Sequence, residues 1–591
     1  MGMTQHEARV DPRKLGVTVS TLLWGVLVLA GSAATATSFI PYGILLAKAK
    51  AATATGQLSF FTPDFYYAMR LRLVAIGAGN IILGFVVFLF RKRIDKVTAR
   101  VFSDSLFLAR KIRLKLKSVP AVDSLTLICL LTIAAFLRIP LLSQPMRDDE
   151  AYTFLQYSSR PFYSALSLYN APNNHLFHTL LVRLAYLVLG NHPWAIRLPA
   201  VVAGLCMVPA SYLAARSLYR GSGALWAAAF VTSSSILIEY STNARGYIIV
   251  ALLFLVLIPI AGYAIRNQNW AAWLLFATLA ALGFYTIPVM LYPFGAISLW
   301  LALSAARSDS QPSPRRAMAG LFAAGGLTAF LTLELYTPVF AVSGPGAVFA
   351  NKWVAAHPLH DLLLGLPPSL ASTWNEWNSD LPPWMPWLLV AGFGISLLWH
   401  PRLSLFRVSL PFSLAVWVGA LVLAQRVIPF ERVWLFALPL YLIAATAGLA
   451  AVMNPLFERL HVRPATALVA IVIAILLGLR VQHNQSIFST NYGRGLEDVA
   501  LYLKANLGPG DSVVAAFPSD NPLLYYFQEV GVSSSYLNAP KPKRTLVVVN
   551  GVTGDTVPKV LQLLKLTDLQ TRSAHFLVQY DSASLYELAP P

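Results

Sequence analysis

Three consecutive carboxylates mark the first place in the chain where chemistry is expected. Asp148, Asp149 and Glu150 follow Arg147 in the segment MRDDEAYTF, directly after an apolar run. A charged side chain buried in hydrocarbon costs about 2.5–3.5 kcal/mol, so carboxylates at the mouth of a membrane span are either solvated or functional. The functional interpretation is an acid/base or metal site. The alternative is an ordinary polar start to a loop.

A second polar segment, EYSTNARGY, separates two later apolar runs and offers Tyr240, Asn243, Arg245 and Tyr247 for binding. A short polar stretch between spans needs protein or water to satisfy its backbone. The segment is therefore either a simple turn between helices or part of a site. If the spans alternate as predicted below, it lies on the same membrane face as Asp149.

Four arginines, at positions 197, 245, 426 and 432, are predicted on this outer face, where arginine is usually depleted. Their forked N–H groups suit a phosphate, with which they form charge-assisted hydrogen bonds. The alternative for each one alone is a snorkelling or helix-end residue. Together with the carboxylates, Arg197, Arg245, Arg426 and Arg432 predict a site for an anionic phosphate group.

Asn174 and His175 open a further apolar helix, with His178 one turn on, and we expect the first two to hydrogen-bond a substrate. Two histidines are a weak metal signal, and the chain has neither zinc-ligand spacing nor a G-x-x-x-x-G-K-[ST] loop. The sequence thus predicts no metal and no cofactor. Four tryptophans of a predicted loop either stack on a sugar or anchor the membrane interface: Trp353, Trp374, Trp377 and Trp384.

The composition indicates the elements that carry these residues. Of 591 residues, 57% are hydrophobic and 12% are charged, against about 25% charged in soluble domains. Apolar runs near 20 residues recur along most of the chain, which predicts a polytopic α-helical membrane protein with about 13 transmembrane helices. The net charge of +19 is concentrated in short loops, while the tail is near neutral. This is the positive-inside pattern and argues against nucleic-acid binding.

With the N-terminus inside and the tail outside, the predicted spans are 15–40, 71–90, 121–142, 197–215, 223–240, 247–265, 270–285, 288–306, 318–340, 386–400, 408–424, 434–452 and 464–479. The first could instead be a cleaved signal peptide. Residues 175–190 are predicted to lie on the outer face without crossing. Residues 91–118 carry ten Lys/Arg and predict a cytoplasmic helix on anionic lipid headgroups.

These spans predict three parts: an N-terminal hairpin with the basic segment (1–120), a membrane core (121–480) and a small extracytoplasmic α/β domain (481–591). In the last part, helices are predicted over 496–507, 522–530 and 558–566, and strands over 512–517, 545–549 and 575–580. Residues 341–385 are predicted to be an external loop rich in Trp and Pro.

The order of these motifs resembles the C-type glycosyltransferase superfamily, and within it the protein O-mannosyltransferase-like group and bacterial relatives that use polyprenyl-phosphate sugars. The resemblance spans roughly 125–480. It rests on the Asp149-Glu150 pair, NNHLFHTLLVRL, the RLPA that ends at Ala200, the S-x-x-A-R-x-Y segment from Ser241, and ERVWLFALPL, which resembles R-Y-L-x-x-x-x-P. The chain departs from the family where Pro-Pro-Leu is common after the His or Lys, because Asn-His-Leu stands here.

The resemblance implies an integral membrane glycosyltransferase, hexosyl- or pentosyl-transferring, with its site on the extracytoplasmic face of a bacterial inner membrane. The donor is expected to be a polyprenyl-phosphate sugar and the acceptor a lipid, glycan or protein hydroxyl. Asp149 is implied as the base, Glu150 as the group that orients it or the acceptor, and Asp148 as the alternative base. The arginines are expected to stabilise the departing phosphate, with inversion at the sugar carbon.

Three other interpretations stay open. A lipid or solute transporter, or flippase, requires charged groups in mid-span and paired broken helices, whereas the charged clusters here lie at span ends. A non-catalytic membrane scaffold with an external binding domain is the second. A metal-dependent oligosaccharide transferase of the same superfamily is the third, and it requires a second carboxylate motif, for which Glu239 is the candidate.

Overall fold

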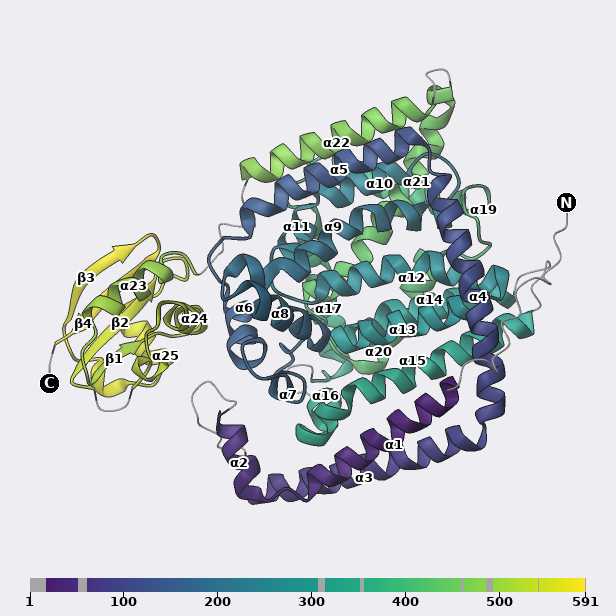
Figure 1. Cartoon of the computed structure of the whole chain (residues 1–591). Helices are drawn as coiled ribbons and strands as arrows, with labels where there is room; N and C mark the ends of the chain where they lie inside the picture. The colour runs from purple at the N-terminus through teal and green to yellow at the C-terminus, as the bar shows by residue number, and fades with distance from the viewer. Residues whose placement is uncertain are drawn as a thin grey trace.

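The computed structural model describes residues 18–51, 61–306, 314–350, 355–458, 462–484, 493–539 and 542–589. It consists of a bundle of apolar helices, a hairpin of two long helices along one side of the bundle, and a small α/β domain beyond one end (Figure 1). That end of the bundle is called the site end below.

The N-terminal hairpin is formed by α1 (Val19–Ser38) and α3 (Pro63–Leu89), with α2 (Tyr42–Ala51) between them. The two helices pack closely because both present glycine, and a Cβ on Gly31 would lie 2.6 Å from the Gly77 carbonyl oxygen. Helix α3 begins eight residues before the predicted span at 71. Most of the large apolar side chains of the hairpin are exposed, as expected of helices that face lipid.

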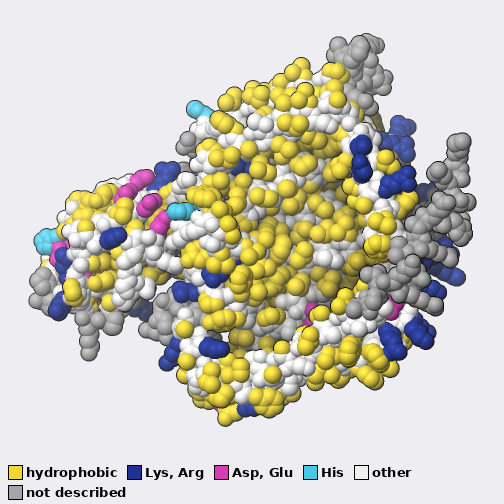
Figure 2. Space-filling model, in the orientation of Figure 1, with side chains coloured by type: hydrophobic (Ala, Val, Ile, Leu, Met, Phe, Trp, Pro, Cys, Tyr) yellow, Lys and Arg dark blue, Asp and Glu magenta, His cyan; other side chains and the backbone are white. Residues whose placement is uncertain are grey.

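Helix α4 (Arg91–Lys117) confirms the predicted basic helix and runs across the bundle end opposite the site end (Figure 1). Its Asp104 carboxylate accepts a hydrogen bond from the backbone N–H of Trp270, at the start of α13, over 2.8 Å. The largest groups of Lys and Arg side chains on the face shown in Figure 2 lie at this end of the molecule, and an apolar surface covers the middle. The distribution matches a helix at a membrane surface.

The bundle buries Leu-, Ala- and Ile-rich helices against one another in a single large apolar core. Its long helices are α5 (Ala121–Arg138), α9 (Pro193–Leu218), α10 (Ala224–Ser233), α12 (Tyr247–Asn267), α13 (Trp270–Thr286), α14 (Leu291–Ala306), α15 (Pro314–Val342), α18 (Met385–Leu398), α20 (Leu410–Gln425), α21 (Ala437–Glu458) and α22 (Val462–Asn484).

Nine helices among the described residues are long and apolar enough to cross a membrane, and each coincides with a predicted span. The four other predicted spans coincide with the shorter apolar helices of 224–233, 270–286, 385–398 and 410–425. The membrane-protein fold is therefore confirmed, while the count of thirteen crossings stays a prediction. The helix predicted to lie on the membrane surface is α8 (Leu176–Leu189).

Short elements gather at the site end: α6 (Asp148–Thr153), the π-helical turn η3 (Phe154–Ser158), α7 (Phe162–Ala165), α11 (Ser235–Ser241), α16 (Gly346–Phe349) and η6 (Glu431–Phe436). The smaller turns are η2 (Ile139–Leu141), η4 (Pro288–Met290) and α19 (His400–Leu403).

The predicted loop 341–385 is wrong over its second half, where α17 (Leu359–Asn378) forms. The helix holds Pro367 and Pro368 in its interior, and this is why it was not predicted from the sequence. Of the loop tryptophans, Trp374 and Trp377 pack their rings on Tyr441, with centroids 6.1 and 6.3 Å away. Trp384 is exposed, and Trp353 lies outside the described residues.

The C-terminal domain is a four-stranded sheet with helices on both faces. Its elements are α23 (Leu496–Asn506), β1 (Asp511–Val514), α24 (Asp520–Val530), η7 (Ser534–Tyr536), β2 (Arg544–Asn550), α25 (Val557–Leu563), η8 (Thr567–Leu569), β3 (Ala574–Tyr580) and β4 (Ala583–Leu588). The strand order is β1-β2-β4-β3, with β1 and β2 parallel and the other pairs antiparallel. Strand β4, which follows β3 through a turn of two residues, was not predicted from the sequence.

The C-terminal domain and the site end share one apolar core. Leu503, Leu523 and Tyr525 of the domain belong to the same buried cluster as Met146 and Phe154, which flank the three carboxylates. The Phe154 and Tyr525 rings meet edge to face, 5.5 Å between centroids. The domain is therefore packed directly on the segment that carries the carboxylates.

Candidate active site

Helix α6 presents the three carboxylates in its first turn, where the partial positive charge of a helix N-terminus favours them. The Glu150 carboxylate accepts a hydrogen bond from the Arg147 backbone N–H, 3.1 Å away, and so caps the helix. Successive side chains on a helix point in different directions, about 100° apart. The three carboxylates therefore enter three different environments.

Glu150 is directed into the protein and forms a closed pair with Arg197 of α9. Arg197 Nη2 and Nε lie 2.6 and 2.9 Å from the two Glu150 oxygens, and neither side chain is exposed. The Ala244 backbone N–H adds a 2.6 Å hydrogen bond from the second polar segment. Burial raises the pKa of the Glu150 carboxyl, but the charge and hydrogen bonds of Arg197 outweigh it and leave the pKa below its usual value.

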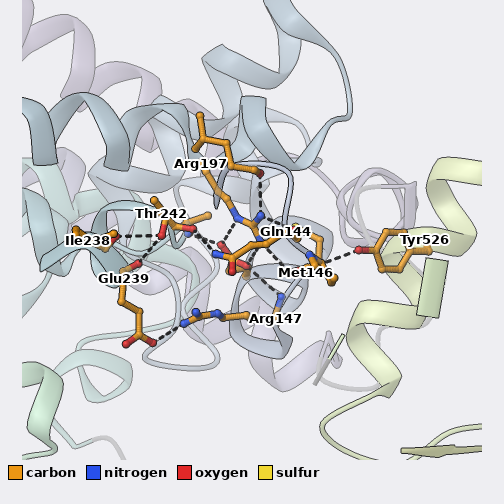
Figure 3. A network of polar contacts seen from close by, with 12 residues as sticks. Gln144, Met146, Arg147, Arg197, Ile238, Glu239, Thr242 and Tyr526 are labelled. Atoms are coloured by element: carbon orange, nitrogen blue, oxygen red, sulfur yellow. Dashed lines mark hydrogen bonds and ion pairs between the residues drawn. The ribbon is translucent and has the colours of Figure 1, made fainter. Parts of the chain in front are cut away.

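Arg197 uses all of its N–H groups within the protein. Besides Glu150, it donates to the backbone carbonyls of Leu142, Gln144 and Pro145 over 2.6–3.0 Å (Figure 3). A guanidinium has five N–H donors, so none is left for a phosphate. The expected phosphate contact is thereby corrected for Arg197: it holds the loop before α6 and fixes Glu150.

Asp149 is directed toward solvent and pairs with Arg245. We call this the open pair, because the carboxylate stays accessible. The Asp149 side chain is 42% exposed, while that of Arg245 is 3% exposed, and Nη2 lies 3.5 Å from the carboxylate. Asn173 lies between them: it donates to Asp149 over 2.9 Å and accepts from Arg245 over 3.2 Å. Arg245 Nη1 is buried and has no hydrogen-bond partner among the described residues.

Asp148 faces the C-terminal domain. Its carboxylate accepts a 2.7 Å hydrogen bond from the Asn521 side chain at the start of α24. The pKa of Asp148 is raised to about 7, chiefly by burial; the Asn521 hydrogen bond opposes this rise and the nearby Asp520 carboxylate adds to it. Tyr526 of the same helix accepts a hydrogen bond from the Met146 backbone N–H over 3.0 Å (Figure 3).

Arg432 joins the site from η6, as expected. Its Nε donates to the Tyr247 hydroxyl over 3.1 Å, and its guanidinium lies 4.6 Å from the Phe430 ring centroid. The Tyr240 and Tyr247 rings meet edge to face, 5.7 Å between centroids. The structure thus brings Arg245, Arg432 and both tyrosines to one place.

His175 lies beside this group and is buried. Its Nδ1 accepts a 2.9 Å hydrogen bond from the Gly246 backbone N–H, while Nε2 has no partner among the described residues. Burial, followed by the charge of Arg245, lowers the pKa of His175 well below its usual value. The imidazole is therefore neutral, with Nδ1 as acceptor, so its proton sits on Nε2, which is left as a free donor. Asn243 likewise keeps a buried, unpartnered Oδ1.

Two expected residues do not join the site. Asn174 donates to the Ala165 and Leu168 carbonyls and accepts from Thr179, so its side chain is used within the protein. Arg426 is the C-cap of α20: its backbone is in the left-handed conformation, φ 54°, and its side chain is exposed. No described contact connects that side chain to Arg245 or Asp149, and the phosphate contact expected of Arg426 stays a prediction.

The site also contains residues outside the predicted catalytic and substrate-binding set. Arg147 Nη1 pairs with Glu239 of α11 over 2.6 Å (Figure 3). Glu376 of α17 lies close enough to Arg432 to sense its charge, and the pKa of its carboxyl is raised to about 7, first by burial and then by Glu431 and Glu239. Among the described residues no three His, Cys, Asp or Glu side chains are grouped to hold a metal ion.

Comparison with known proteins agrees with this architecture. The family model described as dolichyl-phosphate-mannose-protein mannosyltransferase matches residues 172–333, which include His175 and Arg245. No curated protein sequence matches the chain.

The fold is similar to the crystal structure of ArnT from Cupriavidus metallidurans bound to undecaprenyl phosphate, with TM-score 0.53 and 12% identity over 79% of this chain and 98% of that one. The apo state of the same protein gives TM-score 0.51 and 13% identity over 78% and 97%. The archaeal oligosaccharyltransferase AglB from Archaeoglobus fulgidus, at TM-score 0.47, 11% identity and 79% and 74% coverage, is too weak a likeness to carry an argument. The protein is an integral membrane protein with the C-type glycosyltransferase fold, and the resemblance seen in the sequence is confirmed.

Proposed function

We propose that the protein transfers a sugar from a polyprenyl-phosphate donor to a hydroxyl of an extracytoplasmic acceptor. The observation that carries the proposal is the open pair of Asp149 and Arg245. A half-exposed carboxylate and a buried guanidinium with a free N–H meet at the end of a membrane bundle whose fold is that of the superfamily. This arrangement suits a water-soluble hydroxyl on one side and an anionic lipid on the other.

The donor phosphate is placed against Arg245 and Arg432. Arg245 Nη1 and His175 Nε2 are buried donors without partners among the described residues, and an unsatisfied buried donor costs about 1–3 kcal/mol. A phosphate oxygen would satisfy both. As the bond from the sugar carbon to the phosphate oxygen breaks, the electron pair stays on the phosphate, and fixed positive charge stabilises it most at that moment.

Asp149 is proposed as the general base. It would take the proton of the acceptor hydroxyl while that oxygen attacks the sugar carbon opposite the departing phosphate, so that the single displacement inverts the configuration. Asn173 and Arg245 hold the carboxylate for this role. Asp148 is the alternative base, and Glu150, whose oxygens are all engaged by Arg197, Ala244 and Arg147, orients α6 without taking part in the proton transfer.

The proposed orientation places the site end and the C-terminal domain outside a bacterial inner membrane. Its support is the basic helix α4 at the other end of the bundle, because lysine and arginine accumulate on the cytoplasmic side. The tail domain, packed on α6, would then lie over the site on the extracytoplasmic face.

The test is a transfer assay in membranes with labelled polyprenyl-monophosphate sugars as donors. Wild type is expected to release polyprenyl phosphate, and Asp149→Asn to be slower by about a hundredfold, as loss of a general base predicts. Asp361→Asn is the matched control, because that carboxylate is exposed on α17 and pairs only with the exposed His360 among the described residues; wild-type rates are expected for it.

The outcomes separate the possibilities. Equal rates for wild type and Asp149→Asn would make Asp148 the base to test next. Folded protein that turns over no donor in the panel would contradict transfer, and movement of the intact lipid across the membrane would then support the transporter. The best donor of the panel names the sugar.

A further inference from the structure

Arg138, the last residue of α5, is a charged side chain buried without a carboxylate partner. Its exposed fraction is 0%, and the ion pairs of the described residues do not include it. An arginine inside a membrane bundle is costly to keep. The transfer reaction proposed above does not use it, so its retention calls for a separate explanation.

The hydrogen bonds of Arg138 reach three helices. Nε donates to the Ser241 hydroxyl over 2.8 Å, and Nη1 donates to the Thr232 carbonyl over 2.9 Å. A third bond returns to the Ala134 carbonyl of its own helix over 3.1 Å. Each acceptor is neutral, so the guanidinium acts as a bridge and not as half of an ion pair.

The bridge spans a break in a helix. Helix α10 ends at Ser233, Ser234 is extended (φ −68°, ψ 121°), and α11 starts at Ser235. The last carbonyls of a helix lack intrahelical donors, and Thr232 carries one of them. Arg138 satisfies that carbonyl of α10 and also binds Ser241, the last residue of α11, so it ties the end of α10 to the end of α11 across the break.

A glycine on a fourth helix, α9, makes room for this contact. A Cβ on Gly204 of α9 would lie 2.3 Å from Ser241 Cβ and 3.3 Å from Arg138 Nε. Any side chain there would push α11 and the guanidinium away from α9. The close approach therefore depends on Arg138 of α5, Gly204 of α9 and Ser241 of α11 together.

Helix α11 leads directly into the candidate site. Its Glu239 pairs with Arg147, and the residues that follow place the Ala244 N–H on Glu150 and Arg245 beside Asp149. We propose that Arg138 is a positioning residue: it locks the broken α10–α11 helix so that Arg245 stays in place against Asp149. The proposal deepens the proposed function and shares its site.

The first arm of the test is kinetic and uses Arg138→Gln, Ser241→Ala and the double variant. Because a displacement of about 1 Å costs on the order of a hundredfold, Arg138→Gln is expected to lower kcat at least about thirtyfold, and Ser241→Ala by less. The double variant should be no slower than Arg138→Gln alone, because both changes break one bridge. Arg266→Gln is the matched control: that guanidinium donates to the Leu405 carbonyl near the opposite end of α12, and wild-type rates are expected.

The second arm does not depend on transfer activity. Thr242, fully buried just after α11, is replaced by Cys in a chain whose native Cys129 and Cys206 are Ser. Its labelling by a membrane-impermeant maleimide is expected to be slow, and at least about tenfold faster with Arg138→Gln, as local opening predicts. Ser241→Ala, which removes one hydroxyl, serves if Arg138→Gln does not fold.

Unchanged labelling rates in both Arg138→Gln and Ser241→Ala would overturn the proposal, as would additive losses of kcat in the double variant. A wild type without transfer activity would count against the proposed function alone, since the labelling arm would still decide whether Arg138 locks α11.

Discussion

Two arginine–carboxylate pairs on one turn of α6 differ in almost every property. Glu150 and Arg197 are both unexposed, 2.6 Å apart, and hydrogen-bonded on every side. Asp149 and Arg245 are 3.5 Å apart, the carboxylate is 42% exposed, and one guanidinium nitrogen has no partner among the described residues. The first is called the closed pair and the second the open pair.

The comparison shows how one short helix separates structure from chemistry. The closed pair ties the loop before α6 to α9 and to the second polar segment, so it sets where α6 stands. The open pair keeps an exposed carboxylate and a guanidinium nitrogen that has no partner among the described residues. Both can bind a substrate at the site end. Perturbing the closed pair should therefore damage folding, and perturbing the open pair should damage turnover.

Arg197→Met should have the largest effect of all. It leaves Glu150 buried without its partner and the Leu142, Gln144 and Pro145 carbonyls without donors, and breaking a buried pair costs about 3–5 kcal/mol. Thermal unfolding of the purified protein should show a large loss of stability, together with loss of transfer.

The double variant Arg197→Met with Glu150→Leu supplies the control for that change. Replacing both ions by apolar groups removes the unpaired charge, so the double variant is expected to be more stable than Arg197→Met alone. Equal stability of Arg197→Met and wild type would show that the closed pair does not hold the site.

Arg245→Met breaks the open pair, and it should reduce activity much more than stability. Loss of a charge directed at the leaving phosphate is expected to lower kcat/KM at least about a hundredfold, while thermal stability changes far less than in Arg197→Met. Arg245→Lys keeps the charge but loses the forked N–H groups, so its kcat/KM should lie between those of wild type and Arg245→Met. A large loss of stability in Arg245→Met would contradict this prediction and would show that Arg245, like Arg197, mainly stabilises the fold.

Asp148 sharpens the comparison through pH, because it is the third carboxylate of the same turn. Its pKa rises from 3.8 to about 7 on folding. Between those values the unfolded chain releases the proton and the folded one keeps it, so stability falls as pH rises through this window and is level above it. Asp148→Asn removes that loss, and its advantage in melting temperature over wild type should grow from pH 4 to 7.

The same variant separates the two candidate bases. With Asp149 as base, Asp148→Asn should retain transfer within about tenfold of wild type, because only a neighbouring charge has changed. A slower reaction in Asp148→Asn than in Asp149→Asn would exchange the two roles.

The sequence singled out the residues of both pairs but indicated neither pairing, for a physical reason. Polar residues at the ends of apolar runs are a local signal, and Asp149, Arg245 and Arg432 were found by it. The partners of a residue are not local. Whether Arg197 is free or saturated depends on carbonyls near 142–145 and on Glu150, which a pattern in α9 does not reveal.

The part played by the C-terminal domain was equally beyond the sequence. Asn521 meets Asp148 across 373 positions, and Tyr526 meets Met146 across 380. The pattern predicted most helices and strands of the domain, because periodicity is local, but nothing in it indicated that α24 would pack on α6. The positions of the membrane helices were predicted best, since a long apolar run has few alternatives to a helix in a bilayer.

Arg426→Ala should have the smallest effect on donor kcat/KM. It tests whether the donor site extends beyond Arg432. Arg426 and Arg432 are six positions apart in one turn, yet the Arg426 side chain is exposed, while Arg432 reaches the Tyr247 hydroxyl. Exposed side chains without such contacts usually contribute within about 0.5 kcal/mol, so donor kcat/KM should stay within about twofold of wild type in Arg426→Ala and fall further in Arg432→Ala. Equal losses would mean that Arg426 turns toward the donor when the lipid is bound, and the open pair would then extend along the whole turn between α20 and α21.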